Sequence, residues 1–494
     1  MRAQLALVVL VALLAPAAAV AFDNTAPNAA QQWYLDQDDA WTFWPVQPTL
    51  KTVKVAVIDS GIDAGNPAFS GEIAGGVSFV GGSWRTDSCG HGTFVAGEIA
   101  SHPADGEGID GMAFNAKLLI AKVVRTGCDV STPGEIKAIY WAVHHGARVI
   151  NLSIGGLRDP QDSELDSYSP GEQAAIEYAY GKDVLVVAAV GNGTQAPQMP
   201  WPYADYPAAL PHVLGVAAVK DGGDVPAYSN RDQQYVDIAA PGGPIFSVIP
   251  RNLVDTTIAG CSTMTPYSDC GPAEFQNGIG TSFSAAQVSA AAALLIGVDP
   301  ALKAGQVEWL LERSATDADP ASGCPICPVG RDSLTGFGTL DVEAALKLLG
   351  NEHDLPTPDA YEPNDDADMP GAKAWPLKVP QTIEATLDFW DDPIDVYAIR
   401  LDQGETVFIR LDRSRVPNWL TLWRPGTKTV LAPPRSELAD EAARGAVVGG
   451  QERLSYRVTA GGIYYVEVRA GAGMRRPDRY QLSVAISAPT ANRG

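Results

Sequence analysis

Three things are scarce in this sequence: positive charge, histidine and long apolar segments. Its 494 residues carry 35 Lys and Arg against 58 Asp and Glu, a formal net charge of −23. A chain this acidic repels nucleic acid and anionic lipid surfaces, so we expect neither as a partner. Only six histidines are present, so chemistry that needs an imidazole has few candidates. The apolar runs are too short to span a bilayer, so we expect no transmembrane segment.

The N-terminus has the pattern of a secretory signal peptide, which we assign to residues 1–21. Arg2 supplies the positive charge, residues 5–14 form the apolar run, and a small-residue cleavage site at 19–21 precedes Phe22. No cysteine follows the cleavage site, so we expect no lipid anchor. The mature protein should therefore be soluble and secreted, either extracellular or periplasmic.

Cysteine is also sparse, with six residues at positions 89, 128, 261, 270, 324 and 327. An even number in an exported chain predicts disulfides, and six cysteines allow about fifteen pairings. Proximity in the sequence favours Cys261 with Cys270 and Cys324 with Cys327, but the sequence does not decide the pairing. The last pair could also be a redox motif or half of a zinc site. We set both aside because no second Cys/His pair stands near it.

What the sequence does contain is a series of short, continuous apolar runs, at 53–58, 117–124, 147–154, 184–190 and 213–219. Such runs are typical of buried parallel strands, and helical patterns such as 134–145 fall between some of them. Strands that alternate with helices predict an α/β domain with a mainly parallel sheet between two helical layers. Chemistry in such domains collects at the carboxyl ends of the strands. Just past three of these runs stand Asp59, Ser153 and Asn192.

The composition changes at residues 351–368, which are rich in Asp, Pro and Asn. Beyond this stretch apolar residues alternate with polar ones, for example at Tyr397, Ile399 and Leu401, and this period of two predicts short strands. We therefore divide the mature chain into an α/β domain at 22–349, a linker at 350–358 and an all-β sandwich domain at 359–494.

One stretch, residues 277–297, marks the centre of the first domain. Glycines and small polar residues lead into a segment that is apolar all round, which predicts a helix buried on every side. Ser282 stands where this helix begins and where backbone amides lack partners. Its hydroxyl can be an N-cap, or a nucleophile whose oxyanion product is bound by those amides. The second interpretation requires a base and a group that orients the base.

The six histidines leave one clear candidate for the base. Five stand in places that call for no catalytic role, because they end a helix, stand beside prolines or lie in the linker: His102, His144, His145, His212 and His353. His91 lies between two glycines at the start of a small-residue helix. With Asp59 before it and Ser282 after it, the chain holds an acid, a base and a nucleophile in that order.

These motifs resemble the three signatures of the subtilisin-like serine peptidases, the subtilase family. They read Asp59-Ser-Gly-Ile-Asp, His91-Gly-Thr-Phe-Val-Ala-Gly and Gly280-Thr-Ser282, and segments at 149–156, 188–192, 236–242 and 336–341 are also similar. The resemblance covers about residues 31–348. It implies a subtilisin-like fold and a serine endopeptidase that cleaves peptides and proteins through an acyl-enzyme, with no cofactor required for the chemistry. We also expect a monomer.

The resemblance implies a role for each residue of the site. Ser282 attacks the scissile carbonyl, His91 takes and returns the proton, and Asp59 orients the imidazole. The side chain of Asn192 and the backbone N–H of Ser282 bind the oxyanion. Taken singly, Asp59 could be a turn carboxylate and Asn192 part of an Asn-Gly turn.

Two segments are implicated in substrate binding. By resemblance, Ser153, Ile154 and Gly155 form an edge that pairs with an extended substrate backbone; otherwise they are a glycine-rich loop after a strand. Asp205 precedes a Tyr-Pro pair, and in this family that stretch helps to form the floor of the pocket for the residue before the cut. A carboxylate there favours Lys or Arg in that residue, unless Asp205 faces solvent or caps the turn.

The chain departs from the family pattern after the nucleophile, where Ala286 and Gln287 stand in place of a Pro and a His. A proline near a helix start fixes the first turn, so its loss could loosen that turn. No catalytic group is missing.

The C-terminal segment resembles the pre-peptidase C-terminal domain, a β-sandwich appended to secreted bacterial peptidases, over about residues 359–487. Some relatives bind calcium, and this chain has oxygen ligands suited to calcium in matching places, at Glu362, Asn364, Asp365, Asp392 and Asp395. Structural calcium is therefore one expectation. A solvated acidic turn is the other.

Two further functions stay open from the sequence. One is a catalytically silent protein with a subtilase fold whose sandwich binds a partner or matrix, and the intact Asp59, His91, Ser282 and Asn192 count against it. The other is a processing peptidase with narrow specificity instead of a degradative enzyme.

Overall fold

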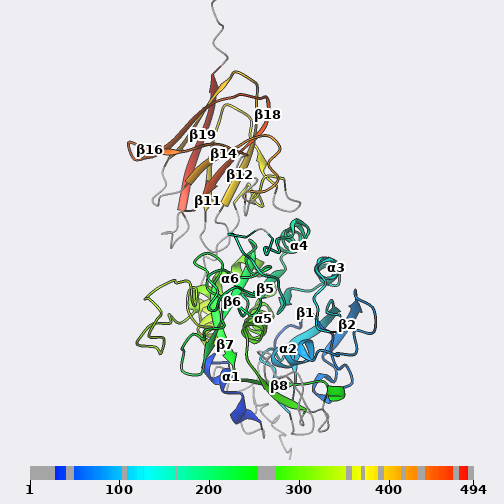
Figure 1. Ribbon diagram of the computed structural model, residues 1–494. Coiled ribbons are helices and arrows are strands. Elements are labelled where there is room, and N and C mark those ends of the chain that lie inside the picture. Colours follow the sequence, from blue (N-terminus) through cyan, green and yellow to red (C-terminus); the bar gives the residue numbers. More distant parts are fainter. Residues whose placement is uncertain are drawn as a thin grey trace, which may run out of the picture.

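The computed structural model describes residues 28–40, 49–102, 108–125, 127–162, 164–253, 274–351, 359–368, 373–387, 394–412, 419–430, 440–470 and 478–487 (Figure 1). They form an α/β domain, coloured blue to green, and an all-β domain, coloured yellow to red. The fold class predicted from the sequence is confirmed. The predicted signal peptide and residues 352–358 of the predicted linker lie outside the described residues, and the domain boundaries stay a prediction.

A seven-stranded parallel sheet forms the centre of the α/β domain, in the order β2-β3-β1-β4-β5-β6-β7. Its strands are β1 Val53–Asp59, β2 Ile73–Ser78, β3 Ala116–Lys122, β4 Val149–Leu152, β5 Leu185–Ala189, β6 Val213–Lys220 and β7 Ile238–Gly243. The five predicted apolar runs correspond to β1, β3, β4, β5 and β6, while β2 and β7 were not predicted. An antiparallel pair, β8 Ile245–Val248 and β9 Phe275–Gly278, lies outside this sheet.

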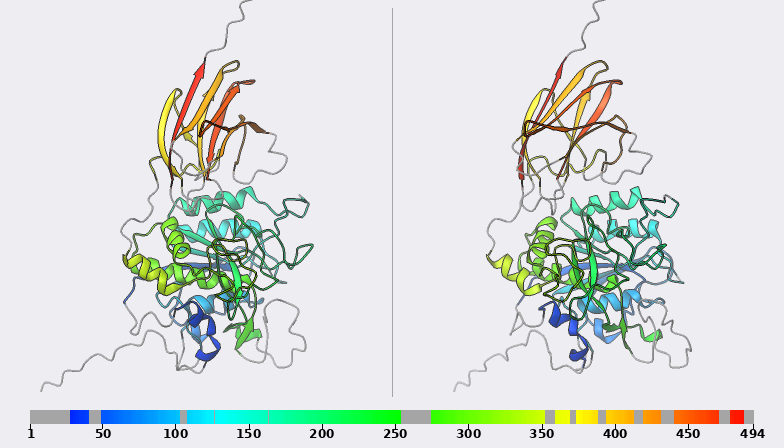
Figure 2. Two further views of the ribbon diagram at one scale, coloured as in Figure 1. Left: turned by 90° about the vertical axis from the view of Figure 1, so that its left-hand side faces the viewer. Right: turned by 60° about the vertical axis from the view of Figure 1, so that its left-hand side comes forward.

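The side chains of each strand alternate between two cores, one on each face of the sheet. In β1, Val55 and Val57 pack in one core, and Ala56 and Ile58 pack in the other. The first core is covered by α1 Trp33–Gln37, α2 His91–Ala100, α5 Thr281–Val298, α6 Ala304–Ser314 and α7 Val342–Asn351. The second is covered by α3 Thr132–His144 and α4 Pro170–Tyr180. Figure 2 shows these helices on opposite sides of the strands, so the predicted three-layer arrangement is present.

Helix α5 is buried from Thr281 to Gly297, as the all-round apolar pattern predicts. Among the described residues, α5 is the one helix that is long and apolar enough to cross a membrane. The apolar runs in the sequence had suggested no such segment. However, 94% of the helix is buried inside the protein. It packs against β1, β3, β4, β5, β6 and β7. Ala286 stands where the family pattern has a proline near the start of α5. This helix start is held instead by the side-chain amide of Gln287, which donates to the carbonyl oxygens of Phe283 and Pro241.

The described residues of the C-terminal domain form strands and no helix, and these strands make up two five-stranded sheets. One has the order β10-β12-β18-β14-β15 and the other β11-β19-β13-β17-β16. Their strands are β10 Trp375–Pro376, β11 Gln381–Leu387, β12 Ile394–Leu401, β13 Thr406–Asp412, β14 Trp419–Trp423, β15 Glu441–Arg444, β16 Ala446–Val448, β17 Gln451–Arg457, β18 Gly462–Arg469 and β19 Asp478–Ser487. Both sheets contribute to one core, for example through Tyr397, Val466 and Leu482. The predicted β-sandwich is therefore present, although its family is not settled.

The two domains meet beside α4, which lies next to the sandwich in Figures 1 and 2. His212, directly before β6, places its Nδ1 2.7 Å from Glu177 Oε2 of α4 and its Nε2 3.6 Å from Asp365 Oδ1 of the C-terminal domain. The amide of Gln173 donates to Asp366 Oδ2 over 3.4 Å. A histidine to which the sequence assigned no role therefore lies at the domain interface.

Two disulfides join cysteines of the described residues, Cys89 with Cys128 and Cys324 with Cys327. The second pairing was predicted from proximity and is confirmed. The first joins residues 39 positions apart, which proximity could not indicate. Cys261 and Cys270 lie outside the described residues.

Candidate active site

Asp59 is the last residue of β1, and its side chain is fully buried. Both carboxylate oxygens lie 2.9 Å from His91 Nδ1, and Oδ1 also accepts the backbone N–H of Ser60 over 2.6 Å. Its backbone carbonyl accepts the N–H of Val123, just past β3. The carboxylate therefore lies at the carboxyl end of the sheet in a fixed orientation, as the position after an apolar run predicts.

His91 is the first residue of α2, and the helix start is packed directly onto the end of β1. Gly92 has no room for a side chain, since a Cβ there would lie 2.3 Å from the carbonyl oxygen of Gly61. The N–H of Gly92 also donates to the Ser60 hydroxyl over 2.8 Å. The glycine after the histidine thus lets α2 approach β1 closely enough for the imidazole to meet Asp59.

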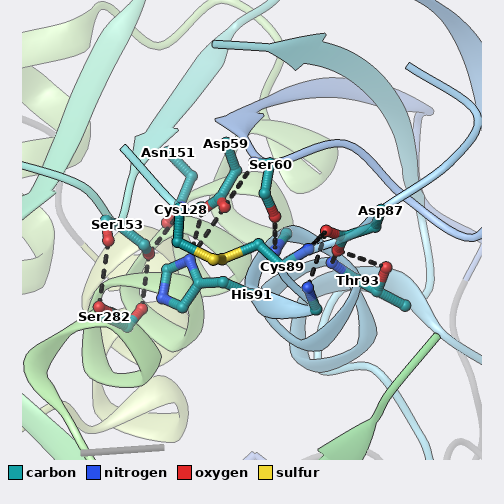
Figure 3. Close-up of polar contacts among 12 residues, drawn as sticks. Asp59, Ser60, Asp87, Cys89, His91, Thr93, Cys128, Asn151, Ser153 and Ser282 are labelled. Carbon is teal, nitrogen blue, oxygen red and sulfur yellow. Dashed lines mark hydrogen bonds and ion pairs between the residues drawn. A yellow bond between two sulfur atoms is a disulfide. The ribbon is translucent and has the colours of Figure 1, made fainter. Parts of the chain in front are cut away.

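Ser282 lies in the first turn of α5, after an N-cap glycine that offers no capping side chain. Its hydroxyl donates to the carbonyl oxygen of Ser153 over 3.1 Å, and the Ser153 hydroxyl donates to the Ser282 carbonyl oxygen over 2.6 Å. Figure 3 shows the His91 ring between Asp59 and this pair of serines. The three residues of the predicted triad, which come from β1, α2 and α5, are thus brought together.

Asn192 follows β5, and its carboxamide is oriented by the residue before the nucleophile. Asn192 Oδ1 accepts the backbone N–H of Thr281 over 2.9 Å and the Thr281 hydroxyl over 3.1 Å. Because the oxygen is occupied in this way, the amide nitrogen is directed to the other side of the group. The Ser282 backbone N–H, one of the first amides of α5, is a second available donor.

The predicted substrate segment lies beside the nucleophile. Ser153 is buried, Ile154 is half-buried and Gly155 is exposed. The next residue, Gly156, pairs with Tyr206 through two backbone hydrogen bonds of 2.9 Å. This pairing fixes Asp205 and Tyr206 next to the segment, so the two predicted substrate-binding elements are adjacent.

Asp205 is half-buried and its Oδ1 atom is buried within the protein, whereas its place in a substrate pocket stays a prediction. Its carboxylate occupies the space where a side chain on Gly191 would lie, with Oδ2 2.1 Å from a Cβ at that position. Burial raises the pKa of Asp205 to about 7, although the Arg158 backbone N–H and the neighbouring Asn230 side chain lower it in part. Asp205 Oδ1 makes no hydrogen bond, and neither side-chain polar atom of the buried Asn230 makes one of good geometry.

Sequence reasoning missed three residues that support this site. Thr281 orients Asn192, and Asn230 lies beside Asp205. Asp87 accepts the N–H groups of Cys89 and Gly90 on one carboxylate oxygen and the N–H of Thr93 on the other. An acidic residue just before a small-residue helix is a helix-start signal that could have identified Asp87. Nothing in the sequence pattern distinguishes Thr281 or Asn230.

The predicted calcium ligands are only partly placed. Glu362, Asn364, Asp365 and Asp395 lie in described segments and Asp392 lies outside them. Burial and the neighbouring carboxylates of Asp365 and Asp395 raise the pKa of Glu362 to about 10. Tyr480 donates to Asp395, and Asp365 faces the domain interface. Within the described residues no group of three or more Asp, Glu, His or Cys side chains is arranged to hold a metal ion.

Comparisons with known proteins agree with the geometry. The model of the subtilase family of peptidases matches residues 50–338. Subtilisin DY of Bacillus licheniformis is 32% identical over 297 residues, which cover 60% of this chain and 91% of that protein. Thermitase of Thermoactinomyces vulgaris is 32% identical over 216 residues, 43% of this chain and 71% of that protein.

A solved structure with the same fold is the psychrophilic subtilisin-like protease Apa1 from the Antarctic psychrotroph Pseudoalteromonas sp. AS-11. It aligns with a TM-score of 0.52 and 21% identity over 66% of this chain and 99% of that chain. At this identity the likeness concerns the fold alone. It agrees with a subtilisin-like fold of the α/β domain. The chain belongs to the subtilase family and is a subtilisin-like serine endopeptidase, a hydrolase of peptide bonds.

Proposed function

We propose that Asp59, His91 and Ser282 form the catalytic triad of this peptidase. His91 accepts the proton of the Ser282 hydroxyl as that oxygen attacks the scissile carbonyl, and later gives a proton to the leaving amine. Asp59 holds the imidazole with its proton on Nδ1 and stabilises the imidazolium. The observation that carries the proposal is the 2.9 Å contact of His91 Nδ1 with both oxygens of Asp59, next to a serine at the start of a buried helix.

The oxyanion of the tetrahedral intermediate is bound by two donors in this proposal. One is the amide nitrogen of Asn192, whose oxygen is held by Thr281, and the other is the backbone N–H of Ser282. Loss of one such donor in subtilisin, a member of this same family, is known to lower kcat by about 100- to 1000-fold. Asn192→Ala should show a loss in that range with an unchanged KM.

The test of the triad is covalent labelling. The protein is treated with a fluorophosphonate, digested, and the adduct is mapped by mass spectrometry. We expect the adduct on Ser282, and no peptide hydrolysis in Ser282→Ala. Ser284→Ala is the matched control, since Ser284 is a buried serine of the same helix whose hydroxyl donates to the carbonyl of Ala240. Hydrolysis that survives in Ser282→Ala, or an adduct on another residue, would contradict the proposal.

The substrate backbone is expected to lie along Ser153, Ile154 and Gly155, where an extended peptide can add as a strand. The exposure of Gly155 and the hydrogen bonds between Ser153 and Ser282 support this placement. Gly155→Val should raise KM for peptides that extend before the cut, because a side chain there would also meet the carbonyl oxygen of Tyr206. An unchanged KM in a folded variant would argue against this binding mode.

Asp205 supports a preference for Lys or Arg before the cut. A cation of the substrate would meet the Asp205 carboxylate and the carboxamide of Asn230, whose polar atoms make no hydrogen bonds of good geometry within the protein. In a poorly hydrated pocket such a pairing outweighs what an apolar side chain gains. The carboxyl is ionised only above its pKa of about 7, so the preference should strengthen as the pH rises through 7.

A peptide library in which the residue before the cut varies tests the preference. Wild type should favour Arg and Lys over Phe and Leu by about tenfold or more, a difference of about 1.4 kcal/mol. Asp205→Asn keeps the shape and removes the charge, so it should abolish the preference, and Asp205→Gly should favour Phe and Leu. A profile led by Phe or Leu that neither variant changes would exclude this role of Asp205.

We also propose that the enzyme is secreted, is monomeric, and carries its chemistry in the α/β domain. Disulfides Cys89–Cys128 and Cys324–Cys327 support an oxidising compartment. A mature N-terminus at Phe22 in the culture medium or periplasm would support export, and light scattering would test the monomer. Deletion of residues 351–494 should leave hydrolysis of a short peptide nearly intact, because Asp59, His91, Asn192 and Ser282 all precede the deletion.

Calcium binding by the C-terminal domain is a weaker proposal. Its support is that Glu362 Oε1, Asp365 Oδ2 and Asp395 Oδ1 are buried without hydrogen-bond partners. No three acidic side chains of the described residues are arranged to hold a metal ion, so a further ligand from outside them would have to complete the site. Calcium should then raise the unfolding midpoint of the wild type and not that of Glu362→Gln. Equal midpoints with calcium and with a chelator would refute it.

A further inference from the structure

The Cys89–Cys128 disulfide ties the start of α2, which carries the proposed general base, to the segment after β3. Cys89 stands two residues before His91, and Cys128 lies in the turn that follows β3. Figure 3 draws the bond together with His91, Asp59 and Ser282. None of the roles assigned above uses this bond.

The start of α2 is held by groups from outside the helix. The N-cap residue, Gly90, has a left-handed backbone (φ 90°) and no side chain, and the helix begins at His91 itself. Asp87 satisfies the free amides of the turn, and Gly92 packs on Gly61 on one face. The covalent link from Cys89 also holds the turn. Helix ends fray more readily than helix interiors, so a covalent bond at this place restrains the base itself.

The other end of the bond is anchored to the same carboxylate residue that His91 meets. Val123 and Val124, which precede the turn, both direct their backbone N–H groups to the carbonyl oxygen of Asp59. Cys128 is fixed in this turn by its N–H bond to the carbonyl of Arg125. The disulfide thus closes a ring of contacts that starts at Asp59, passes through the end of β3 and returns through His91.

We propose that the Cys89–Cys128 disulfide positions His91 between Asp59 and Ser282, so that the peptidase reaches its full rate only when this bond is formed. The proposal rests on the proposed triad. Cys89 and Cys128 are positioning residues, because they act through His91 and do not touch the substrate. Displacing a catalytic group by about 1 Å can cost about 100-fold in rate, so a loosened helix start is sufficient for a large effect.

The bond is open to thiol exchange from one side. Cys128 is exposed, whereas Cys89 is buried. A thiolate of a dithiol reductant attacks the Cys128 sulfur and displaces the Cys89 thiolate, which takes up a proton. The second thiol of the reductant then attacks the mixed disulfide and releases Cys128. Two electrons and two protons reach the protein, and the reductant leaves as its own cyclic disulfide. The Cys324–Cys327 disulfide is buried at both ends and packs in the core on the opposite face of the sheet from α2 and α5.

The test uses the full chain and compares two double variants. Cys89→Ser with Cys128→Ser should lower kcat for a short peptide by about tenfold or more, with KM within about twofold of wild type. Cys324→Ser with Cys327→Ser, the matched control, should keep the wild-type kcat. The acid limb of the kcat/KM profile, which reports the free base, should shift only in the first variant. An unchanged kcat in a folded Cys89/Cys128 variant overturns the proposal.

A reductant titration covers the case in which the variant does not fold. Wild-type activity should fall with dithiothreitol and return on reoxidation, while far-UV circular dichroism stays constant. The Cys324/Cys327 variant should lose activity in the same way. Full activity of the wild type after mass spectrometry has shown Cys89 and Cys128 to be reduced contradicts the proposal. An error in the proposed triad can be told apart from an error in the disulfide proposal. If the triad is wrong, no fluorophosphonate adduct forms on Ser282 even under oxidising conditions.

Discussion

The α/β domain contains two buried histidines that each meet a carboxylate through Nδ1, and only one of them belongs to the proposed triad. His91 meets Asp59 at 2.9 Å at the carboxyl end of β1. His212 meets Glu177 at 2.7 Å at the amino end of β6. By geometry at Nδ1 alone the two pairs are alike, so a buried histidine–carboxylate contact is not by itself a sign of catalysis.

The two histidines differ in the groups that lie next to the rest of each imidazole ring. The ring of His91 has Ser282 beside it, in the first turn of a helix with free amides (Figure 3). His212 has a second carboxylate, Asp365, 3.6 Å from Nε2, and the ring of Tyr180 stacked on it at 3.9 Å. A base between an acid and a hydroxyl can pass a proton on. A histidine between two carboxylates keeps its proton and serves as an ion-pair link between domains.

Electrostatics sharpen this contrast for His212. Burial alone would lower its pKa, but the carboxylates of Glu177 and Asp365 outweigh that effect and hold the pKa well above the ordinary imidazole value. The other charged groups that line the cavity beside it include Glu308, Glu312, Arg331 and Arg469. A group that stays protonated at neutral pH cannot act as a base there.

The largest expected difference comes from replacing each histidine by asparagine. His91→Asn should lower kcat by about 10⁶-fold, the size known for loss of the equivalent base in subtilisin. His212→Asn should leave kcat for a short peptide within about twofold of wild type. Asparagine suits this control because it tolerates the left-handed backbone of His212 (φ 59°). Steady-state kinetics on one chromogenic peptide decides the comparison, and a large loss in the His212 variant would break it.

The carboxylates should differ in the same direction with a smaller effect. Asp59→Asn should lower kcat by about 10⁴-fold, because the imidazole is then held in the wrong tautomer. Glu177→Gln should have little effect on kcat. Measuring kcat for both variants at pH 8 and at higher pH checks the reason, since hydroxide can partly replace the missing base function only at the triad. Equal losses in the two variants would mean that the two pairs share a role.

For the free energy of unfolding, we expect replacement of His212 to have a larger effect than replacement of His91. His212→Asn leaves Glu177 and Asp365 buried without a cation, and such losses cost about 3 kcal/mol. We expect its urea midpoint to fall, and the linker to be cut more readily in limited proteolysis. Ser284→Ala serves as a reference for loss of a buried hydrogen bond elsewhere in the α/β domain. A wild-type midpoint in the His212 variant would show that the domain interface does not depend on this link.

The smallest expected effect is the change with pH in the stability that His212 contributes through Glu177 and Asp365. Because the folded-state pKa of His212 is raised, its contribution to stability is fully present below the unfolded value of about 6.5 and is lost as the pH rises through the folded-state value. The difference in midpoint between wild type and His212→Asn should therefore shrink at alkaline pH. Urea unfolding of both proteins from about pH 5 to about pH 10 measures it. A difference that grows with pH has the wrong sign for this account.

The sequence indicates the residues of the candidate site more directly than it indicates their surroundings, for a physical reason. Asp59, His91, Ser282 and Asn192 each sit in a local pattern that fixes the backbone: an end of an apolar run, a glycine-flanked helix start, or a strand end. Those patterns identify both the residue and the edge of the sheet. The strands of the α/β sheet with continuous apolar runs were predicted for the same reason, whereas β2, half-exposed and glycine-rich, gave no such signal.

The contacts that the sequence could not give are those between distant segments. The Cys89–Cys128 pairing, the position of Asn230 beside Asp205 and the link from His212 to Asp365 depend on how loops and domains pack. Each residue taken alone has several plausible partners. His212 is the clearest case, because its neighbours in the sequence are proline and an apolar strand, and both of its partners come from elsewhere in the chain.

The position of α5 in the chain also has a consequence for the order in which the proposed active site is assembled during synthesis. This helix packs on six of the seven strands of the main sheet and fills one of the two cores, yet it is made after all of those strands. A growing chain therefore has its acid and its base long before it can close that core. Ser282 lies in the first turn of this helix, so the proposed nucleophile is made only when the largest helix of that core is made, and α6 and α7 then follow to cover it.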